Sequence, residues 1–152
     1  MTHNMGEYYQ RVSDYDLEYQ SQTEQDVPFW CELVMRYIPQ RLLELAFGSG
    51  RIGLALLHSP GNFHLEGLDI APEMLNAFRH KLAREPEAVQ QRVTLHEVDM
   101  HVFFPRELQL LFLATGFSIE AIYGGYDWKP FGKGTRQIVV GRKRDILIPP
   151  QA

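Results

Sequence analysis

Three glycines are spaced so that the backbone between residues 48 and 53 could lie directly against a nucleotide-like ligand. Gly48, Gly50 and Gly53 form the pattern G-x-G-x-x-G between two apolar stretches. Glycine permits a tight turn there and leaves room for a ligand to approach the backbone. The same pattern also occurs in ordinary turns between a strand and a helix, so its meaning depends on the residues that accompany it.

Two aspartates end the next two short apolar stretches of the chain. Asp69 follows the first of these stretches and Asp99 follows the second. An acid in the position of Asp69 can accept hydrogen bonds from both hydroxyls of a ribose. Because parallel strands end at one edge of a sheet, we expect the glycine turn and both aspartates to line a single crevice. The set predicts a site for a nucleotide cofactor.

Glu44 lies just before the glycine turn and distinguishes between two such cofactors. A dinucleotide places its pyrophosphate at a helix N-terminus, where a neighbouring carboxylate would repel it. S-adenosylmethionine (SAM) has no phosphate, and its amine and sulfonium are both cationic. Glu44 therefore favours SAM over NAD, although an acid at this point could also do no more than cap the turn.

Strands that alternate with helices surround these residues. Apolar spacing predicts strands over 41–45, 63–68 and 93–98, and helices over 27–38, 52–58 and 72–83. This alternation is typical of βαβ units and a parallel sheet. The remaining elements are a predicted helix over 105–115 and strands over 118–123 and 136–141. Since no helix separates these last two strands, we expect them to be antiparallel.

The composition limits the classes of function. With 152 residues, 45% of them apolar, the chain has the length and composition of one globular domain. A net charge of −4 gives no basic footprint for nucleic acid, and no apolar run is long enough for a membrane span. Cys31 is the only cysteine, and no residue spacing indicates a metal site. We therefore expect a cytoplasmic protein without a metal, a membrane or nucleic acid as partner.

The residues before and after the glycines resemble a known family. LELAFGSGRIG (43–53) is similar to the E-x-G-x-G-x-G signature of the class I SAM-dependent methyltransferases. GLDIAPEML (67–75) and VTLHEVDM (93–100) resemble the motifs of that family's second and third strands. The resemblance implies a cofactor site made by Glu44, Ala46, Gly48, Gly50, Asp69, Ile70, Asp99 and Met100.

Each part of the cofactor is assigned by the same resemblance. The first four residues of that set would surround the methionine part, Asp69 the ribose, Ile70 the adenine face, and Asp99 with Met100 the adenine edge. Ala46 departs from the signature, which has a glycine there, and its methyl group predicts a modest loss of cofactor affinity. Arg51 is expected to support the turn rather than to touch the ligand.

The resemblance extends over nearly the whole chain. Residues 103–117 resemble the family's last helix, residues 120–128 and 136–142 its closing hairpin, and residues 15–19 its tyrosine-bearing arm. It implies a Rossmann-like α/β fold with three layers, αβα. The expected organisation is an arm over 1–26, a methyltransferase-like domain over 27–144 and a tail over 145–152. That domain would comprise a SAM-binding half over 27–100 and the helix and hairpin over 103–144.

A segment that the family places after its third strand is missing. Only three residues separate Asp99 from Phe103, where the family has a fourth strand, a helix and a fifth strand, about 60 residues in all. The first strand is then left with an open edge, which the hairpin, a second chain or strand exchange would have to cover. A homodimer is therefore one expectation. The chain is a naturally shortened enzyme, a deletion remnant that folds as a dimer, or a protein whose full form contains the missing segment.

The function predicted from these residues is the transfer of a methyl group from SAM to a small-molecule acceptor. Two alternatives remain: a non-catalytic SAM-binding or dimerisation module, and an NAD-dependent oxidoreductase, which Glu44 disfavours. No catalytic base is identified, and His101 is a candidate. The aromatic residues that could line a substrate entrance or simply pack are Tyr15, Tyr19, Tyr123 and Tyr126.

Overall fold

The chain divides into two compact units, Met1–Met100 and His101–Ala152. The computed structural model describes residues 16–99, 103–132 and 136–144. The predictions made for residues 1–15, Met100, His101 and the tail over 145–152 lie outside these residues.

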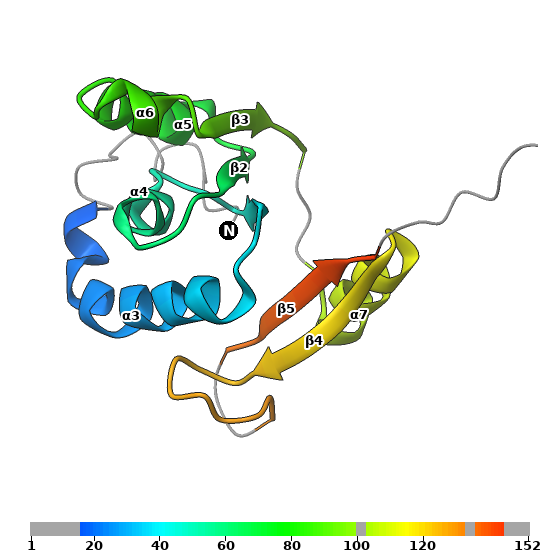
Figure 1. Cartoon of the computed structure of the whole chain (residues 1–152). Helices are drawn as coiled ribbons and strands as arrows, with labels where there is room; N and C mark the ends of the chain where they lie inside the picture. Colours follow the sequence, from blue (N-terminus) through cyan, green and yellow to red (C-terminus); the bar gives the residue numbers. More distant parts are fainter. Residues whose placement is uncertain (1–15, 100–102, 133–135, 145–152) are drawn as a thin grey trace, which may run out of the picture. The chain divides into compact units, whose positions relative to one another are not determined.

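The first unit is a parallel three-stranded sheet with its connecting helices (Figure 1). Its elements are α3 (Gln20–Tyr37), β1 (Arg41–Leu45), α4 (Arg51–His58), β2 (His64–Asp69), α5 (Pro72–Leu82), α6 (Glu87–Gln90) and β3 (Val93–Glu97). The strands lie in the order β1-β2-β3, with Leu45 opposite Leu68 and Asp69 opposite Glu97. This register brings the carboxyl ends of the three strands to one edge of the sheet, as the sequence predicts.

The core of this unit lies on one face of the sheet. Val34 of α3, Leu57 of α4 and Phe78 of α5 belong to one buried cluster together with Leu65 of β2. Leu42, Val93 and Leu95 pack against that cluster from the neighbouring strands. The described residues of this unit thus supply two layers, a sheet and the helices on one face, of the three that the resemblance implies.

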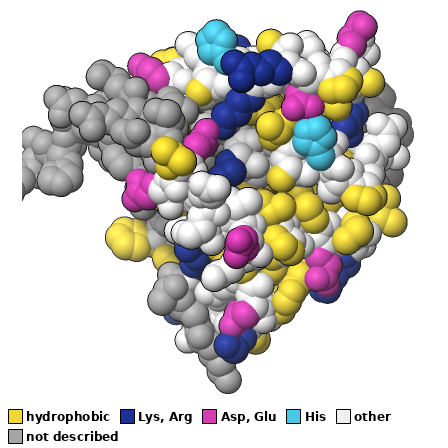
Figure 2. All heavy atoms as spheres, turned by 90° about the vertical axis from the view of Figure 1, so that its left-hand side faces the viewer, with side chains coloured by type: hydrophobic (Ala, Val, Ile, Leu, Met, Phe, Trp, Pro, Cys, Tyr) yellow, Lys and Arg dark blue, Asp and Glu magenta, His cyan; other side chains and the backbone are white. Residues whose placement is uncertain are grey.

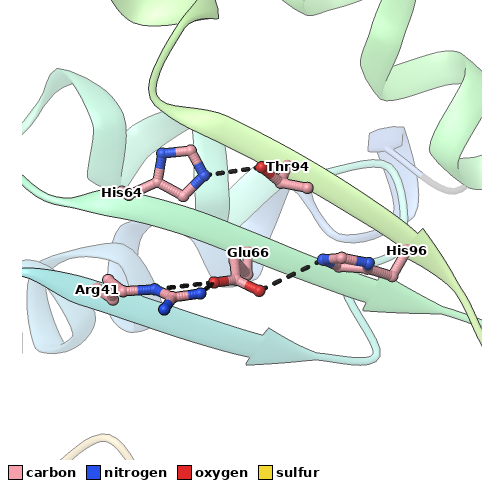
Figure 3. A network of polar contacts seen from close by, with 5 residues as sticks. All are labelled: Arg41, His64, Glu66, Thr94 and His96. Carbon is pink, nitrogen blue, oxygen red and sulfur yellow. Dashed lines mark hydrogen bonds and ion pairs between the residues drawn. The ribbon is translucent and has the colours of Figure 1, made fainter.

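The opposite face of the sheet carries leucines and a polar network. The side chains of Leu43 and Leu45 are 48% and 43% exposed. Figure 3 shows Glu66 between Arg41 and His96 on the three strands, with His96 Nε2 3.3 Å from Glu66 Oε2. The Arg41 guanidinium, which donates hydrogen bonds to Glu66, lowers the pKa of that carboxyl. The charges on this face are therefore partly balanced within it by the pair of Arg41 and Glu66, and the exposed leucines make another part of the face apolar.

The second unit consists of one helix and a hairpin. Its elements are α7 (Pro105–Ala114), β4 (Phe117–Tyr123) and β5 (Ile138–Lys143). The two strands are antiparallel and form a sheet of their own, which confirms the predicted C-terminal hairpin. Phe112 of α7 packs over Gly141 and lies 5.5 Å from the ring of Phe117, measured between ring centres.

Apart from shifts of one residue at element ends, three features of the structure differ from the sequence prediction. α3 begins at Gln20 rather than at residue 27, so part of the predicted arm is helical. The short helix α6 follows Pro86 and was not predicted, because four residues are too few to show a helical period. β5 lies two residues further along the chain than the predicted strand over 136–141.

The described surface has a mixed character. Figure 2 shows acidic and basic side chains interspersed on the face that it displays, with hydrophobic side chains between them. Among the described helices, none is both long enough and apolar enough to cross a membrane.

Candidate cofactor site

The turn after β1 contains three residues in the left-handed conformation. Ala46 has a φ of +56°, Gly48 of +59° and Gly50 of +71°. The left-handed region is open to glycine but costs other residues roughly 1–2 kcal/mol. This conformation gives the family's glycine at the position of Ala46 a physical reason. In this chain Ala46 adopts the left-handed conformation that alanine disfavours, so the backbone is strained at this residue.

An aromatic ring lies beneath the turn, and the sequence did not reveal it. Phe47 is buried at 3% exposure and meets Phe78 edge-on, with 4.8 Å between the ring centres. A Cβ added to Gly53 or to Gly67 would come within 2.5 Å of the Phe47 ring. At these two glycines the close approach is therefore made by Phe47 rather than by a ligand. No periodicity in the sequence signals such a packing, although the bulky residue inside the turn was visible.

Asp69 connects the turn to the start of α5. Its Oδ2 atom accepts a hydrogen bond from the backbone N–H of Gly48 at 2.6 Å, and Oδ1 accepts one from Ala71 at 2.8 Å. The side chain is 7% exposed. Asp69 thus holds the glycine turn in place, and its predicted contact with a ribose remains a prediction.

Glu44 of the predicted site has a buried polar atom whose hydrogen-bonding capacity is not satisfied by the described residues. Its Oε2 atom is buried and has no hydrogen-bond partner among the described residues. Burial raises the pKa of Glu44 to about 8, and the nearby positive charge of Arg51 offsets only part of this effect. A buried carboxyl oxygen without a partner fits a ligand that offers a donor or a cation, and the amine of SAM offers both.

Arg51, the first residue of α4, joins the turn to α3. Its guanidinium donates to both carboxylate oxygens of Asp26, at 2.9 and 2.7 Å, and to Thr23 Oγ1 at 3.0 Å. Asp26 is 1% exposed. The sequence predicts a supporting role for Arg51 but does not identify Asp26 as its partner, although this acid directly precedes the predicted helix over 27–38.

The helical turn before α3 also reaches the glycine turn. Asp16 accepts a hydrogen bond from the hydroxyl of Ser49 and forms an ion pair with Lys81 of α5 at 2.6 Å. Lys81 also donates to the backbone oxygen of Ser49 at 3.1 Å. Asp16 belongs to the segment that resembles the family's arm, and Tyr19 of that segment is the residue just before α3.

The residues predicted for the adenine lie at the same edge of the sheet. Ile70, directly after β2, is 44% exposed, and Asp99, just after β3, is also exposed. A hydrogen bond from Val98 N to Asp69 O at 3.0 Å holds the two strand ends together. The fold thus brings these residues to the edge where the glycine turn begins, while Met100 lies outside the described residues.

Two of the aromatic candidates, Tyr123 and Tyr126, are engaged in packing. Tyr123 meets Trp128 edge-on at 5.3 Å, and Arg136 lies over the ring of Tyr126 at 5.0 Å. These contacts within the second unit favour the packing interpretation of both tyrosines. In the described part of the chain, no three histidine, cysteine or acidic residues gather as a metal site would require.

Comparison with known proteins identifies the fold to which this site belongs. No family model matches the chain, and no curated protein matches it significantly. A solved structure of a TehB-like SAM-dependent methyltransferase from Corynebacterium glutamicum matches with a TM-score of 0.54 at 15% identity. The match covers 88% of this chain and 98% of that one. The chain has the class I methyltransferase fold.

Further matches to this methyltransferase fold are partial. The glycopeptide N-methyltransferase MtfA is 30% identical, with a TM-score of 0.43, over 54% of this chain and 36% of that one. The methyltransferase domain of bacterial CtHen1 is 20% identical, with a TM-score of 0.47, over 55% of this chain and 44% of that one. The chain thus spans less than half the length of these two proteins. MtfA has been crystallised with SAM, with S-adenosylhomocysteine and with sinefungin.

Proposed function

We propose that the protein binds SAM at the carboxyl ends of β1, β2 and β3 and transfers its methyl group to a small-molecule acceptor. The buried Oε2 atom of Glu44, which has no hydrogen-bond partner among the described residues, carries this proposal, because such an atom suits the cationic amine of SAM. The fold that the chain shares with a TehB-like SAM-dependent methyltransferase also supports SAM as the cofactor. A pyrophosphate carries no cation that could complete this buried carboxyl group, which disfavours NAD.

The proposed roles follow the position of each residue. Glu44 and the turn over 46–50 would hold the methionine part, with Asp69 fixing the turn and reaching the ribose. Ile70 and Asp99 would bind the adenine, together with Met100. SAM supplies an already activated methyl group, so the protein has mainly to orient the two reactants.

A second candidate is a SAM-binding module that has lost catalysis. The short link after Asp99 favours it, because the segment that would face the methyl group is not in this sequence. The exposed leucines of β1 agree with it, since that face of the sheet lacks a cover among the described residues of the first unit.

Calorimetric titration with SAM, S-adenosylhomocysteine and NAD tests the cofactor. We expect saturable binding of the first two at one site per chain and no heat with NAD. The absence of both heat and a thermal shift with either adenosyl ligand would overturn the proposal. Methyl transfer to members of an acceptor panel would then support the enzyme, and binding without any turnover would support the module.

A further inference from the structure

We propose that binding of the adenosyl cofactor releases one proton from the protein, and that this proton comes from Glu44. In the free protein Glu44 is a neutral carboxylic acid, and it becomes a carboxylate when it meets the cationic amine. The proton passes to the buffer. This inference rests on the proposed function, and it specifies how the site takes up its ligand.

The surroundings of Glu44 disfavour a charge in the free protein. Its Oε2 atom is shielded from solvent and accepts no hydrogen bond from any described residue. A buried carboxylate that lacks donors is strongly destabilised, and a buried neutral acid much less so.

The neighbouring cation is already neutralised. Arg51 donates two hydrogen bonds to the buried carboxylate of Asp26, whose negative charge balances the positive charge of the guanidinium. Arg51 therefore lowers the pKa of Glu44 only in part. Lys81, which donates to the backbone oxygen of Ser49 in the turn, is paired with Asp16.

Asp69, Glu97 and Asp99, which also lie at this edge of the sheet, are acidic. The two carboxylate oxygens of Asp69 accept hydrogen bonds from the N–H groups of Gly48 and Ala71. Glu97 ends β3 and is exposed. None of these acids can stabilise an ionised Glu44, so a ligand amine is the group that would pair with its carboxylate.

The direction of the pH effect follows from the raised pKa. Burial raises the pKa of Glu44 to about 8, so the free protein holds this proton at neutral pH. An amine in contact favours the carboxylate and lowers the pKa in the complex. Between these two values, affinity increases with pH by up to about tenfold per unit and levels off above the pKa of the free protein.

Calorimetry in several buffers measures the released proton directly. S-adenosylhomocysteine is titrated into the whole chain at about pH 6.5, where an α-amine is protonated. The buffers share this pH and differ in their enthalpy of ionisation. The observed heat should vary with that enthalpy with a slope of about one proton released. With Glu44→Gln the slope should be close to zero at a weaker affinity.

The outcomes separate this inference from the proposed function. Binding by the unaltered chain with no released proton would overturn the inference and leave cofactor binding intact. An equal release from Glu44→Gln would assign the proton to another group and would also overturn it. If the unaltered chain binds no adenosyl ligand, the proposed function itself fails. Should the variant not fold, the slope for the unaltered chain still decides.

Discussion

At the glycine turn, one methyl group separates this chain from the signature that it resembles. Ala46 holds a φ of +56°, and the two glycines that follow share its left-handed conformation. The turn is fixed by hydrogen bonds to Asp69 and to Leu68 rather than by the preference of the alanine. The surrounding structure thus maintains a conformation that alanine disfavours.

Relief of this strain is the first prediction. Ala46→Gly should stabilise the protein by about 0.5–1 kcal/mol, because the gain in the left-handed region exceeds the entropy that glycine loses on folding. Urea unfolding measures the change. As a matched control, Ala77→Gly in the middle of α5 should destabilise the protein by about 1 kcal/mol. Destabilisation by both substitutions would show that the turn is not strained.

The second prediction concerns the pH dependence of stability. A carboxyl group whose pKa is higher in the folded than in the unfolded state favours folding less as pH increases between the two values. Burial raises the pKa of Glu44 to about 8, so Glu44→Gln should gain stability relative to the unaltered chain as pH increases from 5 to 8. Above pH 8 the difference in stability between the variant and the unaltered chain should level off, and a further increase would mean that the pKa of Glu44 is higher than 8. Thermal melts at each pH measure it, and a constant difference would mean that Glu44 titrates normally.

At the scale of the elements, α3 is attached to the site by one buried ion pair. Asp26→Asn should destabilise the protein by about 3–5 kcal/mol, because it leaves the Arg51 charge without its buried partner. The exposed pair of Glu32 and Arg36 lies in the same helix, so Glu32→Gln serves as control and should cost at most about 0.5 kcal/mol. Equal effects in chemical unfolding would contradict this account of α3.

The seating of Phe47 between β2 and α4 gives the next prediction. Gly67→Ala places a methyl group 2.5 Å from the Phe47 ring and should destabilise the protein by about 1–3 kcal/mol. Adding Phe47→Leu should recover part of this loss, which a double-mutant cycle measures. Strict additivity of the two substitutions would show that the ring and the glycine are not coupled.

Much of this arrangement could be predicted, and the missing parts have a common cause. The strands and the helices α4, α5 and α7 follow from apolar residues that recur with a helical or an extended period. The position of Glu44 and Asp69 at one edge follows from parallel pairing. The start of α3 could not be predicted, because its polar first turns are stabilised by Arg51, which is distant in sequence. The ring of Phe47 under the turn is likewise a tertiary contact.

At the scale of the whole molecule, the sheet of the first unit leaves part of β1 exposed in the described structure. β1 pairs with β2 and has no second partner among the described strands, and its leucines are partly exposed. Such an edge is a template for pairing with another chain. The homodimer expected from the sequence therefore stands as a prediction. Analytical ultracentrifugation should find a dimer, and a monomer at high concentration would contradict it.

Nuclear magnetic resonance tests the location of the cofactor most directly. During titration with S-adenosylhomocysteine, the backbone amide signals of Gly48, Gly50, Asp69 and Ile70 should shift and saturate together. The amides of α6 should not shift, because this helix precedes β3 and so lies toward the opposite edge of the sheet. A spectrum without saturable shifts, or with shifts confined to residues away from the glycine turn, would contradict the central claim.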